Sequence, residues 1–315
     1  MTQSTDERPA GPADLPRTGD GSYVPYDKRR LSYAQTFQEP WRIHAIRAIE
    51  LMTGKLALLR RIREFERRGV PPGLGFWAQA LEVMGIEVLT PPEQIAHFPK
   101  TGPVVVVSNH PHGLVDGMVF AATIGRVRDD YKILSRSLLA GVREISEFLI
   151  PVPFPHEKDS FRASVRMREQ TMAHLAAGGV VALFPAGQVA HARTWFGPAV
   201  EASWNPFTAS LIRRSGATVV PMYFPGQNSR AYQIAAQTSA TVRQGLLLHE
   251  VVHALDKPQA PVIGAPITPE EMAPWKDRPG EFIEWLRAHT LALGKGQAGP
   301  APASMSSTSG LTRVP

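Results

Sequence analysis

The sequence contains no cysteine and no long apolar run. Without cysteine, the 315-residue chain can form neither disulfides nor thiolate zinc sites, and it has no cysteine nucleophile. A membrane-spanning helix needs about 20 consecutive apolar residues, whereas the runs at 104–107 and 180–184 are only as long as strands. We therefore expect a protein that does not cross a membrane, and the sequence leaves its redox compartment undecided.

Proline, glycine and serine are concentrated at both ends of the chain. We expect a disordered arm over 1–35, which lacks the apolar centre of a secretory signal, and a disordered tail over 293–315. Between them, 43% hydrophobic residues overall are enough to fill a core. We expect a helical preface at 36–100 followed by an α/β domain at 101–292.

Residues 41–68 have the spacing of an amphipathic helix that Gly54 could break. They hold eight basic and three acidic residues, so they carry nearly the whole net charge of +6. Together with Trp41 and Phe65, this composition suits an anionic membrane surface. A helix packed on the domain with a solvated basic face would show the same pattern, so both interpretations stay open. The apolar positions are Ile46, Ile49, Met52, Leu56, Leu59 and Ile62.

The positive charge would also suit CoA phosphates or a nucleic acid. No recognised nucleic-acid-binding module occurs in the sequence, and the arginines lie on a helix with a strong apolar face. We therefore expect no nucleic-acid partner.

After Pro99 the sequence alternates between short β-branched runs and helical stretches. A helix is predicted over 160–177, and a second begins after Asn205 and ends at Gly216. This alternation predicts an α/β fold with a mixed, largely parallel sheet covered by helices. The predicted strands are 104–107, 131–134, 149–154, 180–184, 218–224 and 262–267.

Three of these strands end in loops rich in glycine and polar residues, at 108–117, 185–188 and 225–229. In open α/β sheets, ligands bind beyond the carboxyl ends of the strands. The three loops can therefore converge on one crevice.

The first loop carries a histidine and an aspartate six residues apart. Pro111 keeps His110 extended, and Gly113 permits a turn that returns Asp116 to the imidazole. A carboxylate that holds one ring nitrogen leaves the other as a general base near neutral pH. His112 could equally be the base, and a surface turn with an incidental His–Asp hydrogen bond would look the same.

The chain has no Gly-x-Ser-x-Gly nucleophile elbow. A His–Asp pair without a serine or cysteine nucleophile suggests that the substrate itself is deprotonated. Acyl transfer from a thioester to an alcohol or an amine fits that chemistry.

The motifs resemble, in order, those of a known family. The loop S-N-H-P-H-G-L-V-D-G resembles the His/Asp motif of the glycerolipid acyltransferases of the lysophosphatidic acid acyltransferase type. It is most similar to their bacterial hemolysin-like branch, which reads N-H-P-x-G-x-x-D-G. The resemblance covers about 32–290, because further blocks match in V-V-A-L-F-P-A-G, V-V-P-M-Y-F-P-G-Q-N-S, A-I-R-A-I-E-L-M-T-G and V-I-G-A-P-I.

The resemblance implies an acyltransferase in which His110 is the general base and Asp116 orients it. It also implies an acyl-CoA or acyl-carrier-protein donor, no other cofactor and no metal. The acceptor would be a hydroxyl or amine of a lysolipid-like molecule, reached from the cytoplasmic, inner face of the membrane. The implied substrate-binding residues are Asn109, His112, Gly113, Arg136, Phe184, Pro185, Ala186, Gly187 and Gln188.

The second motif departs from the common Phe-Pro-Glu-Gly-Thr-Arg form of the family. Ala186 and Val189 replace the glutamate and arginine that the family associates with a glycerol-phosphate acceptor. Gln188 can hydrogen-bond but cannot neutralise a phosphate. His191 and Arg193 are close enough in the sequence to compensate for the missing arginine.

A second motif supports an alternative function. His249, Glu250 and His253 form a His-Glu-x-x-His sequence, which on a helix could bind zinc with the glutamate as general base. No third histidine follows at the longer metzincin spacing, so Glu270 or Glu271 would have to complete the site. A zinc-dependent metallohydrolase is therefore the alternative to the acyltransferase.

Overall fold

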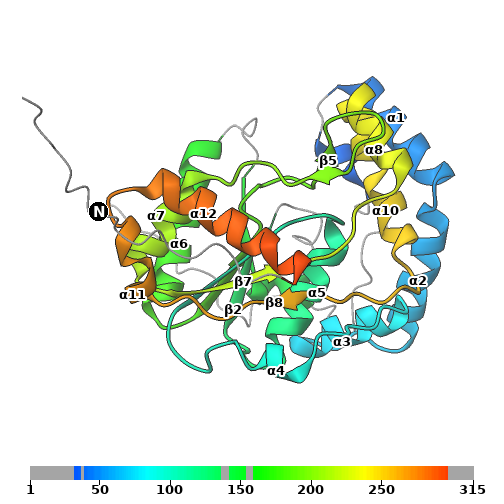
Figure 1. The fold of residues 1–315 in the computed structure, drawn as a ribbon. Coiled ribbons are helices and arrows are strands. Elements are labelled where there is room, and N and C mark those ends of the chain that lie inside the picture. Colours follow the sequence, from blue (N-terminus) through cyan, green and yellow to red (C-terminus); the bar gives the residue numbers. More distant parts are fainter. Residues whose placement is uncertain (1–31, 37–38, 136–141, 154–158, 297–315) are drawn as a thin grey trace, which may run out of the picture.

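The computed structural model describes residues 32–36, 39–135, 142–153 and 159–296 (Figure 1). The predicted arm and tail lie largely outside these ranges. Ser32 and Ala34, which the sequence assigns to the arm, are buried, and η1 (Tyr33–Thr36) packs on the first helix. The carboxylate of Glu50 fixes this turn, because it accepts hydrogen bonds from Ser32 Oγ and Tyr33 N, both at 2.7 Å.

The predicted helical preface is present and breaks where expected. Helix α1 (Pro40–Met52) ends before Gly54, whose φ of +129° suits glycine, and α2 (Lys55–Arg67) follows. Next along the chain come α3 (Leu74–Val83) and α4 (Pro92–Ile95).

The main sheet has six strands in the order β3-β2-β4-β1-β7-β8. Every neighbouring pair is parallel except β7 with β8, so the predicted mixed, largely parallel sheet is confirmed. The strands are β1 (Val104–Ser108), β2 (Tyr131–Ser135), β3 (Leu149–Pro151), β4 (Val180–Leu183), β7 (Thr218–Tyr223) and β8 (Val262–Ile263).

Strands β4 and β7 end one residue earlier than the sequence predicts, and two other strands are shorter by three residues or more. Strand β3 ends at Pro151, and Phe154 lies outside the described residues. Strand β8 ends at Ile263, while Ile267 forms only an isolated bridge to Val219. A short hairpin of β5 (His191–Ala192) and β6 (Ala199–Val200) was not expected from the sequence.

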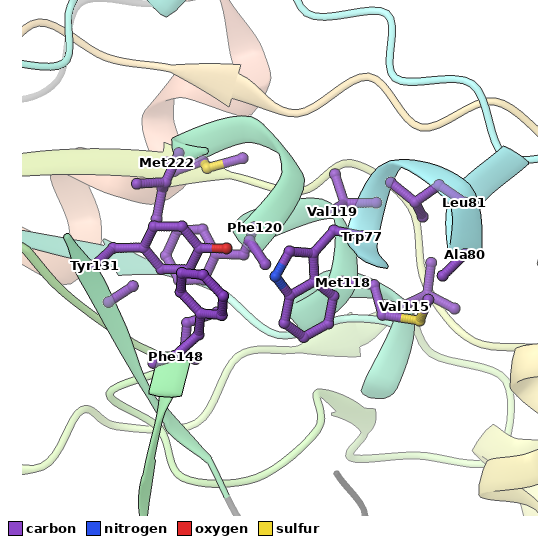
Figure 2. Packing of buried hydrophobic residues seen from close by; sticks show 14 of the residues in the cluster. Trp77, Ala80, Leu81, Val115, Met118, Val119, Phe120, Tyr131, Phe148 and Met222 are labelled. Carbon is purple, nitrogen blue, oxygen red and sulfur yellow. The ribbon is translucent and has the colours of Figure 1, made fainter. Parts of the chain in front are cut away.

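Both faces of the sheet are buried, which explains why its strands read as continuous apolar runs. Val104 and Val106 point into one core, while Val105 and Val107 point into the other. Figure 2 shows the first core, where Trp77 of α3 lies beside Met118 and Val119 of α5 (Leu114–Ile124). Helices α6 (Ser160–Ala176), α7 (Pro206–Ser215) and α12 (Pro279–Ala292) supply the second core.

A separate group of helices lies beside α1 and α2 (Figure 1). Gly245 of α9 lies against Ile49 of α1, where an added Cβ would come within 3.2 Å. Arg61 of α2 forms an ion pair with Asp256 and donates to the carbonyl of Val83, so the preface is held by both charge and packing. The group comprises α8 (Arg230–Thr238), α9 (Ala240–Gly245) and α10 (Leu247–His253).

The remaining elements are short turns of helix. None of the helices in the described ranges is both long and apolar enough to span a bilayer. These turns are η2 (Arg143–Phe148), α11 (Pro269–Met272), η3 (Ala273–Trp275) and η4 (Leu293–Lys295).

The predicted ends of α7 are confirmed. Asn205 Oδ1 accepts from Phe207 N at 2.8 Å, Pro206 stands in the first turn, and Gly216 ends the helix in the left-handed region at φ +60°. Glycine at position 216 is therefore required by the backbone conformation and not by lack of room for a side chain, because an added Cβ would meet nothing within 4 Å.

We predict that Gly216→Ala lowers the free energy of unfolding by about 1 kcal/mol, because alanine is strained at positive φ. Gly280→Ala is the matched control, since Gly280 lies in α12 without positive φ and an added Cβ there also meets nothing within 4 Å. This control should be neutral or slightly stabilising in urea unfolding. Equal effects of the two substitutions would contradict the explanation.

Candidate active site

The end of β1 is fixed to the end of β7 by one asparagine side chain. Asn109 is buried; its Nδ2 donates to the carbonyl of Phe224 at 2.9 Å, and Phe224 N donates to its Oδ1 at 2.8 Å. The side chain thus continues the strand pairing beyond the last β residues. It determines where the following residue, His110, leaves the sheet.

The backbone of His110 is held from two sides. Its N–H donates to Glu201 Oε2 at 3.2 Å, and its carbonyl accepts from Ala190 N at 2.8 Å. Glu201 also accepts from Trp204 Nε1 at 3.0 Å. Burial raises the pKa of the Glu201 carboxyl, and the hydrogen bonds from Trp204 and His110 only partly offset that rise.

The sequence did not indicate Glu201 as a functional residue. It lies about 90 positions from the histidine loop and belongs to no recognisable motif. Only the folded structure brings it to His110.

Asp116 lies in the first turn of α5 and is completely buried. Its Oδ2 accepts from the backbone N–H of His112 at 2.7 Å and of Gly113 at 3.1 Å. Gly113 has φ +79°, which allows the chain to turn into the helix directly after the histidines. The carboxylate therefore sits at a helix N-terminus, where the helix dipole favours negative charge.

Both imidazoles donate to this single carboxylate. His110 Nδ1 lies 3.0 Å from Asp116 Oδ2, and His112 Nδ1 lies 2.9 Å from Oδ1. Because an ionised carboxylate only accepts hydrogen bonds, each ring carries its proton on Nδ1 toward Asp116. The Nε2 atom of each neutral ring is then left on the opposite edge.

The cluster strongly favours the ionised carboxylate. Burial by itself would raise the pKa of Asp116, but attraction to His112 and hydrogen bonds from both imidazoles outweigh it and hold the pKa at about 2. Burial would lower the pKa of His112, yet the charge of Asp116 and its hydrogen bond raise it overall. The pair Asp116 and His112 is thus stabilised as an ion pair.

The two histidines have different surroundings. His110 lines a cavity of about 550 Å³ and stacks on the ring of Phe184, with centroids 3.9 Å apart. His112 instead points toward the third loop, since a Cβ added at Gly226 would lie 3.0 Å from its Nε2. Of the two, only His110 is among the residues that line the cavity.

The cavity has an apolar part and a polar part. The wall from β2, β3, α6 and α7 is mainly apolar but includes Ser135, Ser164, Arg168 and Thr208, and the wall from η1, α8 and α9 is polar. Apolar lining residues are Ile133, Leu134, Leu149, Val152, Met167, Leu183 and Phe207. The polar part is lined by Tyr33, Tyr232, Arg243 and Gln244.

The residues expected at the substrate divide into three groups. Asn109 and His112 make the hydrogen bonds given above, and Ala186 packs against the second core. None of these three is among the described residues that line the cavity. Arg136 lies outside the described residues. Those that line the cavity with His110 are Gly113, Phe184, Pro185, Gly187 and Gln188.

The three predicted loops converge. The first loop carries the histidines, the second contributes the cavity wall from Phe184 to Gln188, and the third contacts both Asn109 and His112. All three follow the carboxyl ends of the central strands β1, β4 and β7. The first and second loops thus line one cavity at that edge of the sheet, and the third loop contacts the first without lining it.

The His-Glu-x-x-His residues lie on α10 and have other partners. His249 Nδ1 donates to the carbonyl of Thr53 at 2.9 Å, and His253 lies beside Lys257 Nζ at 3.3 Å. Glu250 is buried and accepts from Ser229 Oγ at 2.6 Å and from Ser229 N at 2.7 Å. The described part of the chain brings no group of three potential metal ligands together.

A family model described as Acyltransferase matches residues 72–254, more than half of the chain. Among solved structures, the chain is similar to the 1-acyl-sn-glycerophosphate (LPA) acyltransferase PlsC from Thermotoga maritima. That match has a TM-score of 0.46 and 13% sequence identity, and it covers 81% of this chain and 98% of that one. No curated protein matches the sequence.

The cluster predicts a pH dependence of stability. Because the folded-state pKa of His112 is raised, its attraction to Asp116 stabilises the fold fully below about pH 6 and is lost as the pH rises through that pKa. We expect the difference in free energy of unfolding between wild type and His112→Gln to be larger at about pH 5.5 than at about pH 9, as measured by urea unfolding. His44→Gln, at an exposed position of α1, is the control and should show no such trend. A difference that is constant with pH would contradict the ion pair.

Proposed function

The chain belongs to the acyltransferase family, and from that membership we propose that it transfers a fatty acyl group from a thioester to a lysolipid-like acceptor. The donor is an acyl-CoA or an acyl carrier protein, and the acceptor group is a hydroxyl or an amine. The observation that supports the proposal most directly is the geometry of His110. Its ring is held by a buried carboxylate on one edge and lines a partly apolar cavity.

In this proposal His110 Nε2 removes the proton from the acceptor group as that group attacks the thioester carbonyl. Asp116 keeps the Nδ1–H of His110 in place and stabilises the imidazolium that forms. The tetrahedral intermediate then collapses, the carbon–sulfur bond breaks, and the departing thiolate takes the proton from His110 Nε2. The chain's own residues supply every proton transfer, and the acyl group is not attached to the protein.

Two observations favour His110 over His112 as the base. His110 faces the cavity, whereas His112 lies against Gly226. In addition, the raised pKa of His112 favours its protonated form, which cannot accept a proton. We therefore assign His112 to the support of Asp116.

Backbone amides at the cavity wall would stabilise the oxyanion. The N–H of Gly113 is bound to Asp116, and that of Gly187 donates to the carbonyl of Phe184. Leu114, at the N-terminus of α5, and Gln188 are the neighbouring cavity residues that remain for this role. A donor of this kind contributes ~3–4 kcal/mol to transition-state stabilisation in other enzymes.

The apolar part of the cavity would hold the fatty chain. Its walls are mainly aliphatic and aromatic, although Ser164, Arg168 and Thr208 also line them. The volume of the whole cavity, about 550 Å³, falls within the ~300–1,000 Å³ usual for ligand pockets. The reacting thioester would then lie beside His110 at the carboxyl edge of the sheet, where the strands Val104–Ser108 and Val180–Leu183 end.

We predict that His110→Ala reduces acyl transfer by ~10²–10⁴-fold, because a positioned general base contributes about that factor. Release of free thiol from palmitoyl-CoA and from palmitoyl carrier protein is measured against a panel of lysolipid and amine acceptors. His112→Gln is the companion variant and should lose less than tenfold. Loss of activity in His112→Gln with retention in His110→Ala would overturn the assignment of the base.

We also propose that α1 and α2 dock the protein on the inner face of an anionic membrane. The expected apolar stripe is divided in the structure: Ile46 is buried in the protein, while Met52 is 77% exposed. Trp41, Leu51 and Leu56 are 64%, 56% and 55% exposed, so the outward-facing part of the stripe is continuous with large apolar side chains. The inward side of the helices thus packs on the domain, and the outward side is the surface that we propose for the membrane.

The basic residues of this surface also divide into two groups. Arg61 is paired with Asp256, and Arg68 with Glu64 and Glu82, so these arginines support the fold. Arg47, Arg60 and Arg63 are exposed and form no ion pair within the described residues. The second group would attract anionic lipid headgroups.

We predict that Trp41→Glu with Met52→Glu reduces binding to phosphatidylglycerol vesicles at least tenfold, since each exposed apolar side chain gains about 1.5–3 kcal/mol on burial. Binding is measured by vesicle sedimentation. Phe161→Glu is the control, because Phe161 is 81% exposed on α6, a helix that lies away from α1 in Figure 1. Equal losses in both variants, or no loss in the double variant, would contradict docking through α1.

A further inference from the structure

Two arginines line the cavity: Arg168 of α6 lies over the ring of Phe207, and Arg243 stands in the polar part, where no described carboxylate neutralises its charge. Arg243 of α9 lines the cavity, and it forms no hydrogen bond or ion pair within the described residues. We propose that Arg243 binds an anionic group on the headgroup of the acyl acceptor. This inference rests on the proposed function and extends it to the class of acceptor.

The position of Arg243 follows from the helix that carries it. Leu247 lies close to Gly113, since its Cδ2 would be 3.9 Å from an added Cβ there. The helical hydrogen bonds continue from α9 into α10, with Leu246 N donating to the carbonyl of Val242 at 3.1 Å. Arg243 therefore stands about one helical turn, or roughly 6 Å, from the residue that touches the histidine loop. That is a suitable distance from the reacting group for a headgroup charge.

The electrostatic surroundings of Arg243 favour an anion. No aspartate or glutamate is among the described residues that line the cavity. The two buried carboxylates nearby have partners of their own: Glu50 binds Ser32 and Tyr33, and Glu250 binds Ser229. The guanidinium is thus a positive charge in a partly desolvated wall, where an anionic ligand would bind more strongly than in water.

Tyr232 adds a second polar group beside Arg243. Burial raises the pKa of Tyr232 to about 12, although the charge of Arg243 opposes that rise. Tyr232 also lines the cavity, so at neutral pH its hydroxyl can donate a hydrogen bond to the same ligand.

The anion belongs to the acceptor rather than to the donor on chemical grounds. In an acyl-CoA, the whole pantetheine arm separates the thioester from the nearest phosphate. In a lysolipid, the charged group is only a few bonds from the free hydroxyl. A cation about one helical turn from the histidine loop matches the second spacing.

Arg243 supplies from α9 the cation that the second motif lacks. The two candidates near that motif, His191 and Arg193, are not among the described residues that line the cavity. His191 pairs within the β5–β6 hairpin, and Arg193 is exposed.

The test uses the full chain with Arg243→Gln, Arg243→Lys and, as a control, Arg193→Gln. The acceptors are octanoyl lysophosphatidate and the uncharged octanoylglycerol, and thiol release gives kcat and KM. We expect Arg243→Gln to raise the KM for the anionic acceptor about ten- to a hundredfold with little change in kcat. The lysine variant should restore most of the affinity, and the KM for octanoylglycerol and the behaviour of Arg193→Gln should match the wild type.

A second arm distinguishes the source of the anion. Palmitoyl-CoA is compared with palmitoyl-N-acetylcysteamine, a thioester without phosphate. If Arg243→Gln raises the KM for palmitoyl-CoA alone and leaves the acceptor KM unchanged, the arginine serves the donor and the proposal is wrong. An unchanged KM for every substrate also overturns it.

Direct binding separates this proposal from the proposed function. Calorimetric titration of wild type and Arg243→Gln with octanoyl lysophosphatidate requires no turnover. Weaker binding by the variant supports the anion site even if no acyl transfer is detected. Equal binding by both proteins contradicts the site even if transfer is detected.

Discussion

The buried carboxylate of Asp116 organises the loop that carries the two histidines and the start of α5. Asp116 accepts from two imidazoles and two backbone amides, and it lies in the first turn of α5. These four donors offset the free-energy cost of burying the charged carboxylate. Removing one partner of a buried charge costs several kcal/mol. The same contacts fix the tautomer of both histidines, the turn at Gly113 and the direction of α5. The local fold and the proposed chemistry therefore depend on the same hydrogen bonds.

The sheet delivers this carboxylate and its histidines to a defined place. Central strands buried on both faces give β1 a rigid position, and Asn109 extends that rigidity one residue beyond the strand. Glu201 and Ala190 then hold the backbone of His110 from the other side. A base fixed through its backbone and through one ring nitrogen needs little reorganisation to act, which is a general requirement of efficient catalysis.

The sequence predicted the features that depend on local chemistry. Alternating runs and helix-capping residues gave the sheet and the ends of α7, and the spacing of His110, Pro111 and Asp116 gave the carboxylate–imidazole pair. It could not choose between His110 and His112, because that choice depends on Gly226, which is more than 100 positions away. Glu201 and Arg243 were missed for the same reason: neither belongs to a motif, and only long-range packing brings Glu201 to the backbone of His110 and Arg243 to the cavity. The His-Glu-x-x-His pattern matched a motif locally, but its side chains are occupied by Thr53 and Ser229.

The turn at Tyr33 gives the preface a second part in the architecture. Tyr33 forms part of the cavity wall, and its backbone N–H donates to Glu50 in the last turn of α1. A chain shortened to the family-matched region would start at residue 72 and would lack this part of the cavity wall. In the intact chain, a movement of α1 would also move this wall, because the Glu50 carboxylate joins the two. The shape of the cavity therefore depends on the position of α1, and so on any surface that the outer face of α1 contacts.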